Sequence, residues 1–362
     1  MSEITDVLAA IDALHLRGER MALATVVSTR GSTYRRAGAR LLVPERGASV
    51  GNLSGGCLEG DVERIGRELL DSGVPRLELF DLRAEDDAVW GYGLGCNGAI
   101  EVFIEPAEQA LATASALRLA VEEGRACCLA TVLSTSSAQV APGDRALVTS
   151  DGPMGDANPD IRDLAAAALA ADDGGIHSLH MPDGEARVFA EVLQPALRLL
   201  ICGAGHDVVP LVTGAAGMGW RVTITDVRRQ LLTHDRFPGA TDFIHAPPGE
   251  GVAAFAPGER DYLVVMSHNY YKDLEYLRAL LDAPFAYLGQ LGPRLRTQQL
   301  LRELDRSDAI DRLHAPAGLD LGAEGPGEVA WAIVAEMLAV RRGRDAGFLR
   351  DRHAPIHEAS LE

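Results

Sequence analysis

The cysteines that could act as nucleophiles or as soft metal ligands lie in two glycine-rich segments. Cys57 follows Gly55 and Gly56 in the segment 51–61, GNLSGGCLEGD, directly before a predicted helix, and Cys96 lies in the similar segment GYGLGCNG. Glycine lets a ligand approach the main chain closely, and the positive end of a helix dipole favours thiolate, the reactive form of cysteine. These segments predict reactive thiols; the alternative is that both cysteines are packing residues in tight turns.

A second group of candidate residues belongs to a predicted βαβ unit. A buried strand over residues 197–202 leads into Gly203, Gly205 and His206, then a helix, and then a strand that ends at Asp226. This spacing is typical of dinucleotide sites, in which the glycines admit a pyrophosphate at the helix N-terminus and the carboxylate accepts from a ribose hydroxyl. The pattern predicts a Rossmann-like sheet with a nucleotide or dinucleotide as its ligand.

Two later strands bring further polar residues to the same edge of that sheet. His268 follows the strand at 261–266, and Arg294 and Arg296 follow the strand at 285–288 and open a helix. The dipole disfavours cations at a helix N-terminus, so a bound anion would account for both arginines. The alternative is that they are solvated surface residues.

The overall composition excludes several classes of function. A net charge of −18 argues against nucleic acid and anionic membranes as main partners. The only lysine is Lys272, which excludes a Walker-type phosphate loop and most Schiff-base chemistry. No apolar run approaches the roughly 20 residues of a membrane helix, and the N-terminus lacks a signal-peptide pattern. Five cysteines without framework spacing indicate reduced thiols, so we expect a cytoplasmic protein.

An internal repeat organises the first half of the chain. Residues 129–135, LATVLST, match residues 23–29, LATVVST, at six of seven positions, and the predicted strands that follow keep the same order. We therefore predict that residues 20–105 and 126–194 are two copies of one α/β unit. The second copy lacks both glycine–cysteine segments, so they are not needed for the fold, and Cys127 and Cys128 are expected to be packing residues. Residues 28–33 are predicted to form a turn.

These patterns predict an α/β protein with a duplicated N-terminal domain and a C-terminal Rossmann-like, doubly wound parallel sheet. The expected boundaries are 1–110 for the unit with Cys57 and Cys96, 111–195 for its degenerate copy, 196–345 for the Rossmann-like domain and 346–362 for a tail.

Together these motifs resemble the XdhC/CoxI family of molybdenum-cofactor maturation proteins. The resemblance rests on the segments GSTYRRAG (31–38), LSGGCLE (53–59), GLGC (93–96), GAGH (203–206) and GLDLGAE (318–324). It implies a protein that binds molybdenum cofactor, plain or nucleotide-appended, and supports its sulfuration and insertion into a xanthine dehydrogenase-type hydroxylase, rather than a turnover enzyme. A molybdenum hydroxylase apo-enzyme and a cysteine desulfurase are the implied partners, and we expect a homodimer.

Soft thiolates suit molybdenum or a transferable sulfur, whereas backbone amides and arginines suit a phosphate. We therefore expect the pterin between the two domains, with Cys57 and then Cys96 as molybdenum contacts or sulfur carriers. Gly203 to His206 are expected near the phosphate or an appended nucleotide. Two alternatives remain: an NAD(P)-dependent oxidoreductase, and a nucleotide or redox-signal binding protein indifferent to both cysteines.

Overall fold

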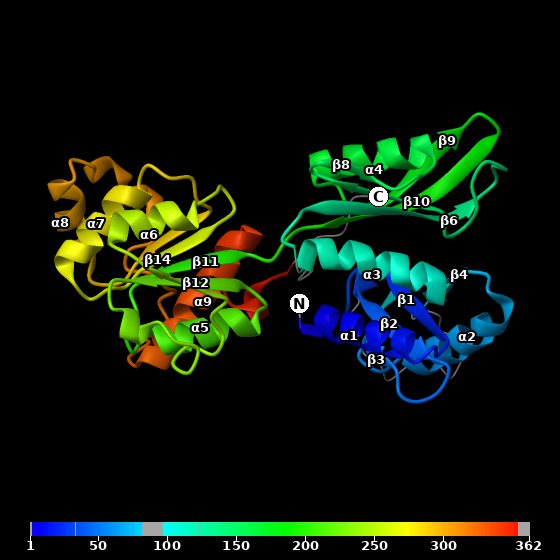
Figure 1. Ribbon diagram of the computed structural model, residues 1–362, viewed down its shortest axis with the longest axis horizontal. Helices are drawn as coiled ribbons and strands as arrows, with labels where there is room; N and C mark the ends of the chain where they lie inside the picture. The colour runs from blue at the N-terminus through cyan, green and yellow to red at the C-terminus, as the bar shows by residue number, and fades with distance from the viewer. Residues whose placement is uncertain (1, 33, 82–96, 122, 354–362) are drawn as a thin grey trace. The chain divides into compact units, whose positions relative to one another are not determined.

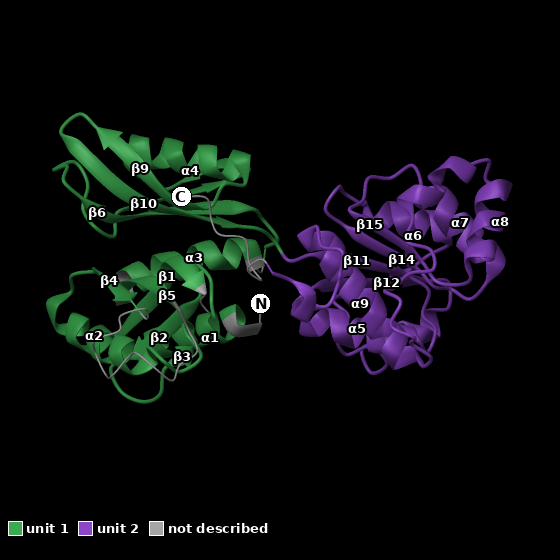
Figure 2. Ribbon diagram, turned by 180° about the vertical axis from the view of Figure 1, so that it is seen from behind, with its two compact units in different colours: residues 1–195, 354–362 green, residues 196–353 purple. Residues whose placement is uncertain are grey.

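The computed structural model describes residues 2–32, 34–81, 97–121 and 123–353 and divides into two compact units (Figures 1 and 2). Within the described residues, unit 1 ends at Pro195 and unit 2 covers residues 196–353. Both predicted N-terminal copies thus belong to one compact unit, and the second unit begins where the sequence pattern changes.

Unit 1 contains two antiparallel sheets with the same strand order. In spatial order the first sheet consists of β3 (Val50–Gly51), β2 (Arg40–Pro44), β1 (Met21–Ser32), β5 (Asn97–Pro106) and β4 (Arg76–Asp81). The second consists of β8 (Gly152–Met154), β7 (Arg145–Thr149), β6 (Cys127–Thr135), β10 (Gly184–Leu193) and β9 (Gly175–Met181). This identical order agrees with the predicted duplication.

The structural repeat is longer than the repeat visible in the sequence. Each copy begins with a helix, α1 (Ser2–Leu16) or α3 (Ala107–Val121), and carries a second helix before its fourth strand, α2 (Glu59–Ser72) or α4 (Pro159–Ala171). The copies are therefore residues 2–106 and 107–193, and the expected boundary at 110/111 falls inside α3.

The first long strand of each copy carries a β-bulge at the same place. The pairing of β1 with β5 shifts at Val27, and that of β6 with β10 shifts at Leu133. Both extra residues pack with Phe103 and Phe189 between the two sheets. Pairing continues beyond the bulge to Ser32, so the predicted turn at 28–33 is wrong: the bulge absorbs the irregularity and the strand goes on.

Within the described residues, an ion pair between Arg118 and Asp12 joins α3 to α1, and three further ion pairs join the sheets of the two copies in a reciprocal pattern. Arg40 of β2 pairs with Glu191 of β10, and the equivalent Arg145 of β7 pairs with Glu105 of β5 at 2.6 Å. Glu101 and Arg187, which are equivalent to each other by register, form the third pair at 3.1 Å. The two copies thus face each other around an approximate twofold relation.

Apolar helix faces complete the core of unit 1. Val62, Ile65 and Leu69 of α2 cover one face of the first sheet, while α1 and α3 pack on the other. Helix α3 also contacts the second sheet through Leu119 and Ala120, so it lies between the sheets, and α4 covers the far face of the second sheet (Figure 1).

The copies differ in the number of residues between their last two strands. In the second copy β9 and β10 are joined by residues 182–183, whereas residues 82–96 separate β4 from β5. Cys96 belongs to that insertion and lies outside the described residues. The insertion is an addition to the repeated fold.

Unit 2 is a parallel sheet with helices on both faces. Its strands, in spatial order, are β13 (Asp242–His245), β12 (Arg221–Asp226), β11 (Arg198–Cys202), β14 (Tyr262–Val265) and β15 (Tyr287–Gln290). One face packs against α5 (Val208–Gly217) and α9 (Pro326–Arg342), the other against α6 (Pro248–Phe255), α7 (Tyr270–Leu280) and α8 (Arg294–Glu303). Short 3₁₀ turns lie at Arg229–Leu231, Ser307–Arg312 and Leu349–Asp351.

The continuous apolar run of β11 is buried on both sides, as parallel strands require. The chain runs from β11 to β13 in one direction and then returns to β14 and β15 on the other side. The strand order therefore reverses between β11 and β14, which confirms the predicted Rossmann-like sheet. At such a reversal, ligands bind beyond the carboxyl ends of the strands.

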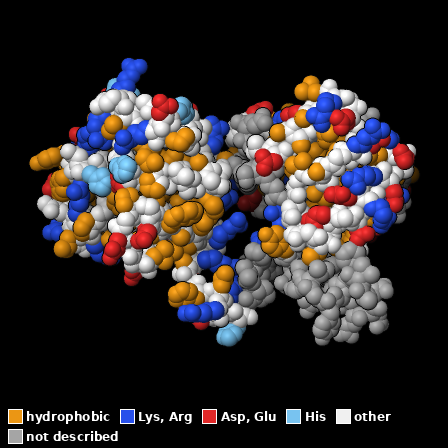
Figure 3. Space-filling model, turned by 90° about the horizontal axis from the view of Figure 1, so that it is seen from below, with side chains coloured by type: hydrophobic (Ala, Val, Ile, Leu, Met, Phe, Trp, Pro, Cys, Tyr) orange, Lys and Arg blue, Asp and Glu red, His pale blue; other side chains and the backbone are white. Residues whose placement is uncertain are grey.

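One face of the molecule shows mixed charge. On the face in Figure 3, acidic and basic side chains of the described residues are interspersed in both units. None of the helices in the described part of the chain is long and apolar enough to cross a membrane.

Candidate functional site

The Cys57 segment forms a loop whose conformation only glycine adopts readily. Gly55 and Gly56 have φ angles of +84° and +112°. A Cβ on Gly55 would lie 3.4 Å from the ring of Tyr34, so this loop meets the segment that follows β1. The half-buried Cys57 then precedes the first turn of α2 and packs at the edge of the apolar core beneath it.

Glu59 holds this loop together. Its carboxylate accepts hydrogen bonds from the amides of Leu53 (3.0 Å), Ser54 (2.9 Å), Gly56 (3.0 Å) and Leu58 (3.1 Å) and from the Ser54 hydroxyl (2.6 Å). The Ser54 hydroxyl accepts from the Cys57 amide at 2.9 Å, and the Asn52 side chain accepts from the Gly55 amide at 3.0 Å. Every amide from residue 53 to 58 thus has a partner inside the loop.

This network changes what Gly55 and Gly56 can offer a ligand. The sequence predicts that these glycines let a ligand approach the main chain closely, but the Glu59 carboxylate and the Asn52 side chain already accept from their amides. Both glycines are exposed and let a ligand approach closely without supplying the hydrogen bonds. What the loop presents to a ligand is therefore chiefly the Cys57 side chain.

The hydrogen bonds to Glu59 also set its protonation. Partial burial alone would raise the pKa of this carboxyl, but the Ser54 hydroxyl and the amides of Ser54 and Leu53 outweigh it and lower the pKa to about 2. Glu59 therefore stays ionised well into the acid range.

We expect Glu59→Gln to destabilise unit 1 by ~1–3 kcal/mol at neutral pH, because a charged acceptor of several hydrogen bonds is lost. A lowered folded-state pKa stabilises the fold above the unfolded pKa, and that contribution disappears as pH falls through the folded pKa. The wild type should therefore lose this contribution between the ordinary value of 4.5 and about 2, and the variant should not. Urea unfolding across that range, followed by circular dichroism, measures the difference; parallel pH profiles would contradict it.

The described cysteines fall into two groups. Cys57 is partly exposed, whereas Cys127, Cys128 and Cys202 are fully buried. Burial raises the thiol pKa of Cys127 to about 11 and of Cys128 to about 12, and raises that of Cys202 well above its usual value. Buried neutral thiols are inert, so the chemistry predicted for cysteine falls to Cys57 within the described residues.

In unit 2, the predicted residues gather where the strand order reverses. Gly203 (φ +121°) directly follows β11, and a Cβ there would lie 2.8 Å from the carbonyl oxygen of Met266. Beyond β14, His268 has a left-handed backbone (φ +55°), and its Nε2 lies 2.6 Å from Oδ2 of Asp207. His268 is exposed, as is His206 in the adjoining loop.

The Asp207–His268 contact therefore links the loops that follow β11 and β14, where the strand order reverses. Gly205 lies beside it, and a Cβ on Gly205 would lie 2.5 Å from Oδ1 of Asp207. The structure brings Gly203, Gly205, His206 and His268 together as expected from the sequence. Asp207 was not among the predicted residues. It fixes the His268 ring, and the signal that could have pointed to it is a polar residue directly after a glycine turn.

Asp226 has partners of its own. Its two oxygens accept from the Ala204 amide (2.9 Å) and from the Arg228 amide and guanidinium (2.7–2.9 Å). Burial alone would raise the pKa of Asp226, but these hydrogen bonds, led by the Arg228 side chain, lower it. The Asp226 carboxylate, predicted to accept from a ribose hydroxyl, anchors the glycine loop instead. The Arg228 guanidinium that it binds stays half-exposed at the edge of the sheet.

The two arginines at the start of α8 differ in their surroundings. Arg296 forms an ion pair of 2.6 Å with Asp273, whose carboxylate is buried and also accepts from Ser267 and Gln290. Arg294 is exposed and makes no ion pair or hydrogen bond within the described residues. Arg296 thus has a structural partner, and Arg294 is the cation available to an anion.

The structure thus combines a duplicated α/β unit that presents a cysteine loop with a Rossmann-like unit that presents a cationic strand edge. Residues 14–81 match the XdhC and CoxI family, and residues 199–337 match the XdhC Rossmann domain. The chain belongs to the XdhC/CoxI family, which confirms the resemblance seen in its motifs.

Three known proteins are similar over most of the chain. A probable xanthine dehydrogenase subunit of Bacillus subtilis (strain 168) is 35% identical over 334 residues, 92% of this chain and 96% of that protein. Molybdenum cofactor insertion chaperone PaoD of Escherichia coli (strain K12) is 25% identical over 92% of this chain and 86% of its own. The crystal structure of a xanthine dehydrogenase from Bacillus halodurans aligns with a TM-score of 0.74 at 31% identity, covering 94% of this chain and 96% of that one.

Proposed function

We propose that this protein binds molybdenum cofactor as cargo, supports its sulfuration and passes it to a xanthine dehydrogenase-type molybdenum hydroxylase. Family membership and the name of the Escherichia coli relative support this class of function. A cysteine desulfurase is the proposed source of sulfur, and a homodimer the proposed assembly.

The observation that carries the proposal is the partly exposed Cys57 in a loop whose amides are already paired. Such a loop holds its shape without a ligand and presents a soft sulfur donor. Soft thiolates suit molybdenum or a transferable sulfur, and ordinary packing would bury the thiol as it buries Cys127 and Cys128. Cys57 is our first choice as molybdenum contact or sulfur carrier, and Cys96 the second.

The edge of unit 2 is proposed to hold a nucleotide or phosphate portion of a ligand. Gly203, Gly205 and His206 lie at the N-terminus of α5, and Arg228 and Arg294 add exposed positive charge on the same unit. Guanidinium groups and helix N-termini both favour phosphate. An ordinary NAD-dependent oxidoreductase is disfavoured, because Asp226 is already bound to Arg228 and Ala204 and has no oxygen left for a ribose.

The proposal is tested by purifying the protein from a host fed with molybdate and analysing the bound small molecules by mass spectrometry and metal counting. We expect a molybdopterin species in amounts comparable to the protein. A preparation that carries nicotinamide nucleotide and no pterin or molybdenum would contradict the proposal.

For the unit 2 edge, we expect Arg294→Ala to weaken binding of a nucleoside diphosphate by ~1–3 kcal/mol, the range for one charged hydrogen bond. Arg296→Ala should weaken binding less than Arg294→Ala and should mainly lower stability, because it leaves the Asp273 carboxylate without its ion pair. Calorimetric titration measures the affinity. Arg302→Ala, the same change in the last turn of α8, is the matched control and should bind like wild type. If all three variants bind with the affinity of the wild type, Arg294 and Arg296 are ordinary surface residues and the proposed anion site is wrong.

A further inference from the structure

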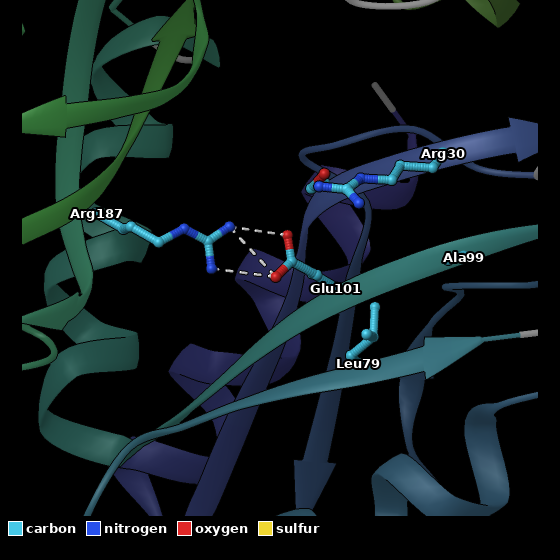
Figure 4. A pocket seen from close by; sticks show the side chains of 6 residues that line it. Arg30, Leu79, Ala99, Glu101 and Arg187 are labelled. Atoms are coloured by element: carbon cyan, nitrogen blue, oxygen red, sulfur yellow. Dashed lines mark hydrogen bonds and ion pairs between the residues drawn. The ribbon is translucent and has the colours of Figure 1, made fainter. Parts of the chain in front are cut away.

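Unit 1 contains a cavity that none of the predicted site residues touches. It has a volume of about 320 Å³ and is lined by Ser28, Arg30, Leu79, Ala99, Glu101 and Arg187. These residues come from β1, β4 and β5 of the first copy and from β10 of the second. The cavity therefore lies between the two copies, at the ion pair that joins Glu101 to Arg187 (Figure 4).

The charges around this cavity do not balance. Arg187 donates to both carboxylate oxygens of Glu101 at 3.1–3.3 Å, so this pair is neutral overall. Arg30 points toward the same carboxylate from the other side in Figure 4 but makes no hydrogen bond or ion pair within the described residues. Among the six residues that line the cavity, one positive charge is therefore left over. Both guanidinium groups are accessible, since Arg30 is exposed and the Arg187 side chain is 39% exposed.

The second copy shows that the fold does not require this arginine. By strand register, Ser136 and Glu185 of the second copy occupy the positions of Arg30 and Ala99. There the Ser136 hydroxyl accepts from the Glu185 amide at 3.0 Å, and Asp183 closes the neighbouring turn. The second copy thus closes this end with its own turn, whereas the first copy has an arginine at the equivalent position.

The remaining walls are apolar. Leu79 points into the cavity from β4 with 64% of its surface exposed, and Ala99 forms part of the floor and is buried. An exposed leucine on a strand beside two guanidinium groups can cover a flat apolar group whose anionic end reaches the arginines. A volume of about 320 Å³ is at the small end of ligand pockets and matches a ring-sized group.

We propose that this cavity binds a phosphate monoester carried on a ring, with the phosphate held by Arg30 and Arg187 and the ring against Leu79 and Ala99. A phosphate monoester carries up to two negative charges and accepts the paired hydrogen bonds that guanidinium groups offer. The inference deepens the proposed function and rests on it, because it assigns the cavity to the phosphate-bearing end of a pterin cargo.

The test uses phenyl phosphate as the probe, titrated calorimetrically into the full-length protein. We expect Arg30→Gln to raise its Kd about tenfold, as expected for one charged contact at an accessible site, and Arg30→Lys to restore part of the loss. Leu79→Gln should weaken phenyl phosphate but leave inorganic phosphate unchanged. Arg162→Gln, which removes an exposed arginine of α4 paired only with Asp163, is the matched control and should bind like wild type.

If Arg30→Gln and wild type bind phenyl phosphate equally, the proposed cavity site is wrong. If Arg30→Gln loses the probe yet co-purifies with as much pterin as wild type, the site binds a different phosphate monoester and the link to the cargo is overturned. Wild type that binds the probe through Arg30 but carries no pterin would contradict the proposed function and leave the cavity site standing.

Discussion

Cys57→Ser is expected to leave the protein folded and to remove most of its ability to hold and transfer sulfurated molybdenum cofactor. Serine is nearly isosteric with cysteine, and hydrogen bonds to Glu59 and Ser54 hold the loop. A hydroxyl is neither a soft ligand nor a carrier of transferable sulfur at neutral pH. Cofactor content should fall at least about tenfold, the lower end of losses seen when a group that supports a metal site is removed.

The measurement is reconstitution of an inactive apo-hydroxylase with cofactor-loaded protein, with molybdenum counted per chain. Cys127→Ser and Cys128→Ser are the matched controls, because both thiols are buried. They should cost about 1 kcal/mol of stability through a hydroxyl in the core and leave cofactor handling intact. Cys96→Ser, outside the described residues, should give an intermediate loss. If Cys57→Ser loads and transfers like wild type, Cys57 is a structural residue and the proposed role is wrong.

Much of the fold could be predicted from the sequence because its signals are local. The apolar runs at 197–202 and 221–225 and the glycines between them predict a βαβ unit, and β11 and β12 pair in parallel as expected. The repeat was visible because LATVVST and LATVLST form the same strand, buried in the same way, in both copies. The sequence does not show that helices α1 and α3 are a repeated pair, because they share only an apolar face. Many different sequences can form such a face.

The site was predicted less completely, because proximity across the fold has no local signal. The glycine–cysteine segment indicated a main chain that a ligand could approach closely. The Glu59 carboxylate, which accepts from the amides of this loop, belongs to the same motif, but the sequence does not show which way its side chain points. Likewise Asp226 ends its strand as expected, yet Arg228 two residues later turns back onto it. The cavity at Arg30 and Arg187 joins residues 157 positions apart and could not be found without the pairing of the two copies.

The largest effect on stability is expected at the ion pairs between the copies. The Glu105 side chain is 4% exposed and accepts from Arg145 at 2.6 Å and from Thr113 at 2.8 Å. Removing one partner of a buried ion pair leaves an uncompensated charge and costs about 3–5 kcal/mol. Glu105→Gln should destabilise unit 1 by this amount, because the Arg145 guanidinium keeps its charge among acceptors that are all neutral.

Hydrogen exchange read by mass spectrometry over β5 and β6 measures this effect in the full-length chain without a two-state assumption. Protection in both strands should fall by two orders of magnitude or more, since about 1.4 kcal/mol corresponds to a factor of ten. The double variant Arg145→Met with Glu105→Met removes both charges and should cost less than the two single changes together. Arg162→Gln, which breaks only an exposed pair, should stay within about 0.5 kcal/mol of wild type. If Glu105→Gln exchanges like Arg162→Gln, apolar packing around Phe103 and Phe189 holds the copies together and the ion pairs contribute little.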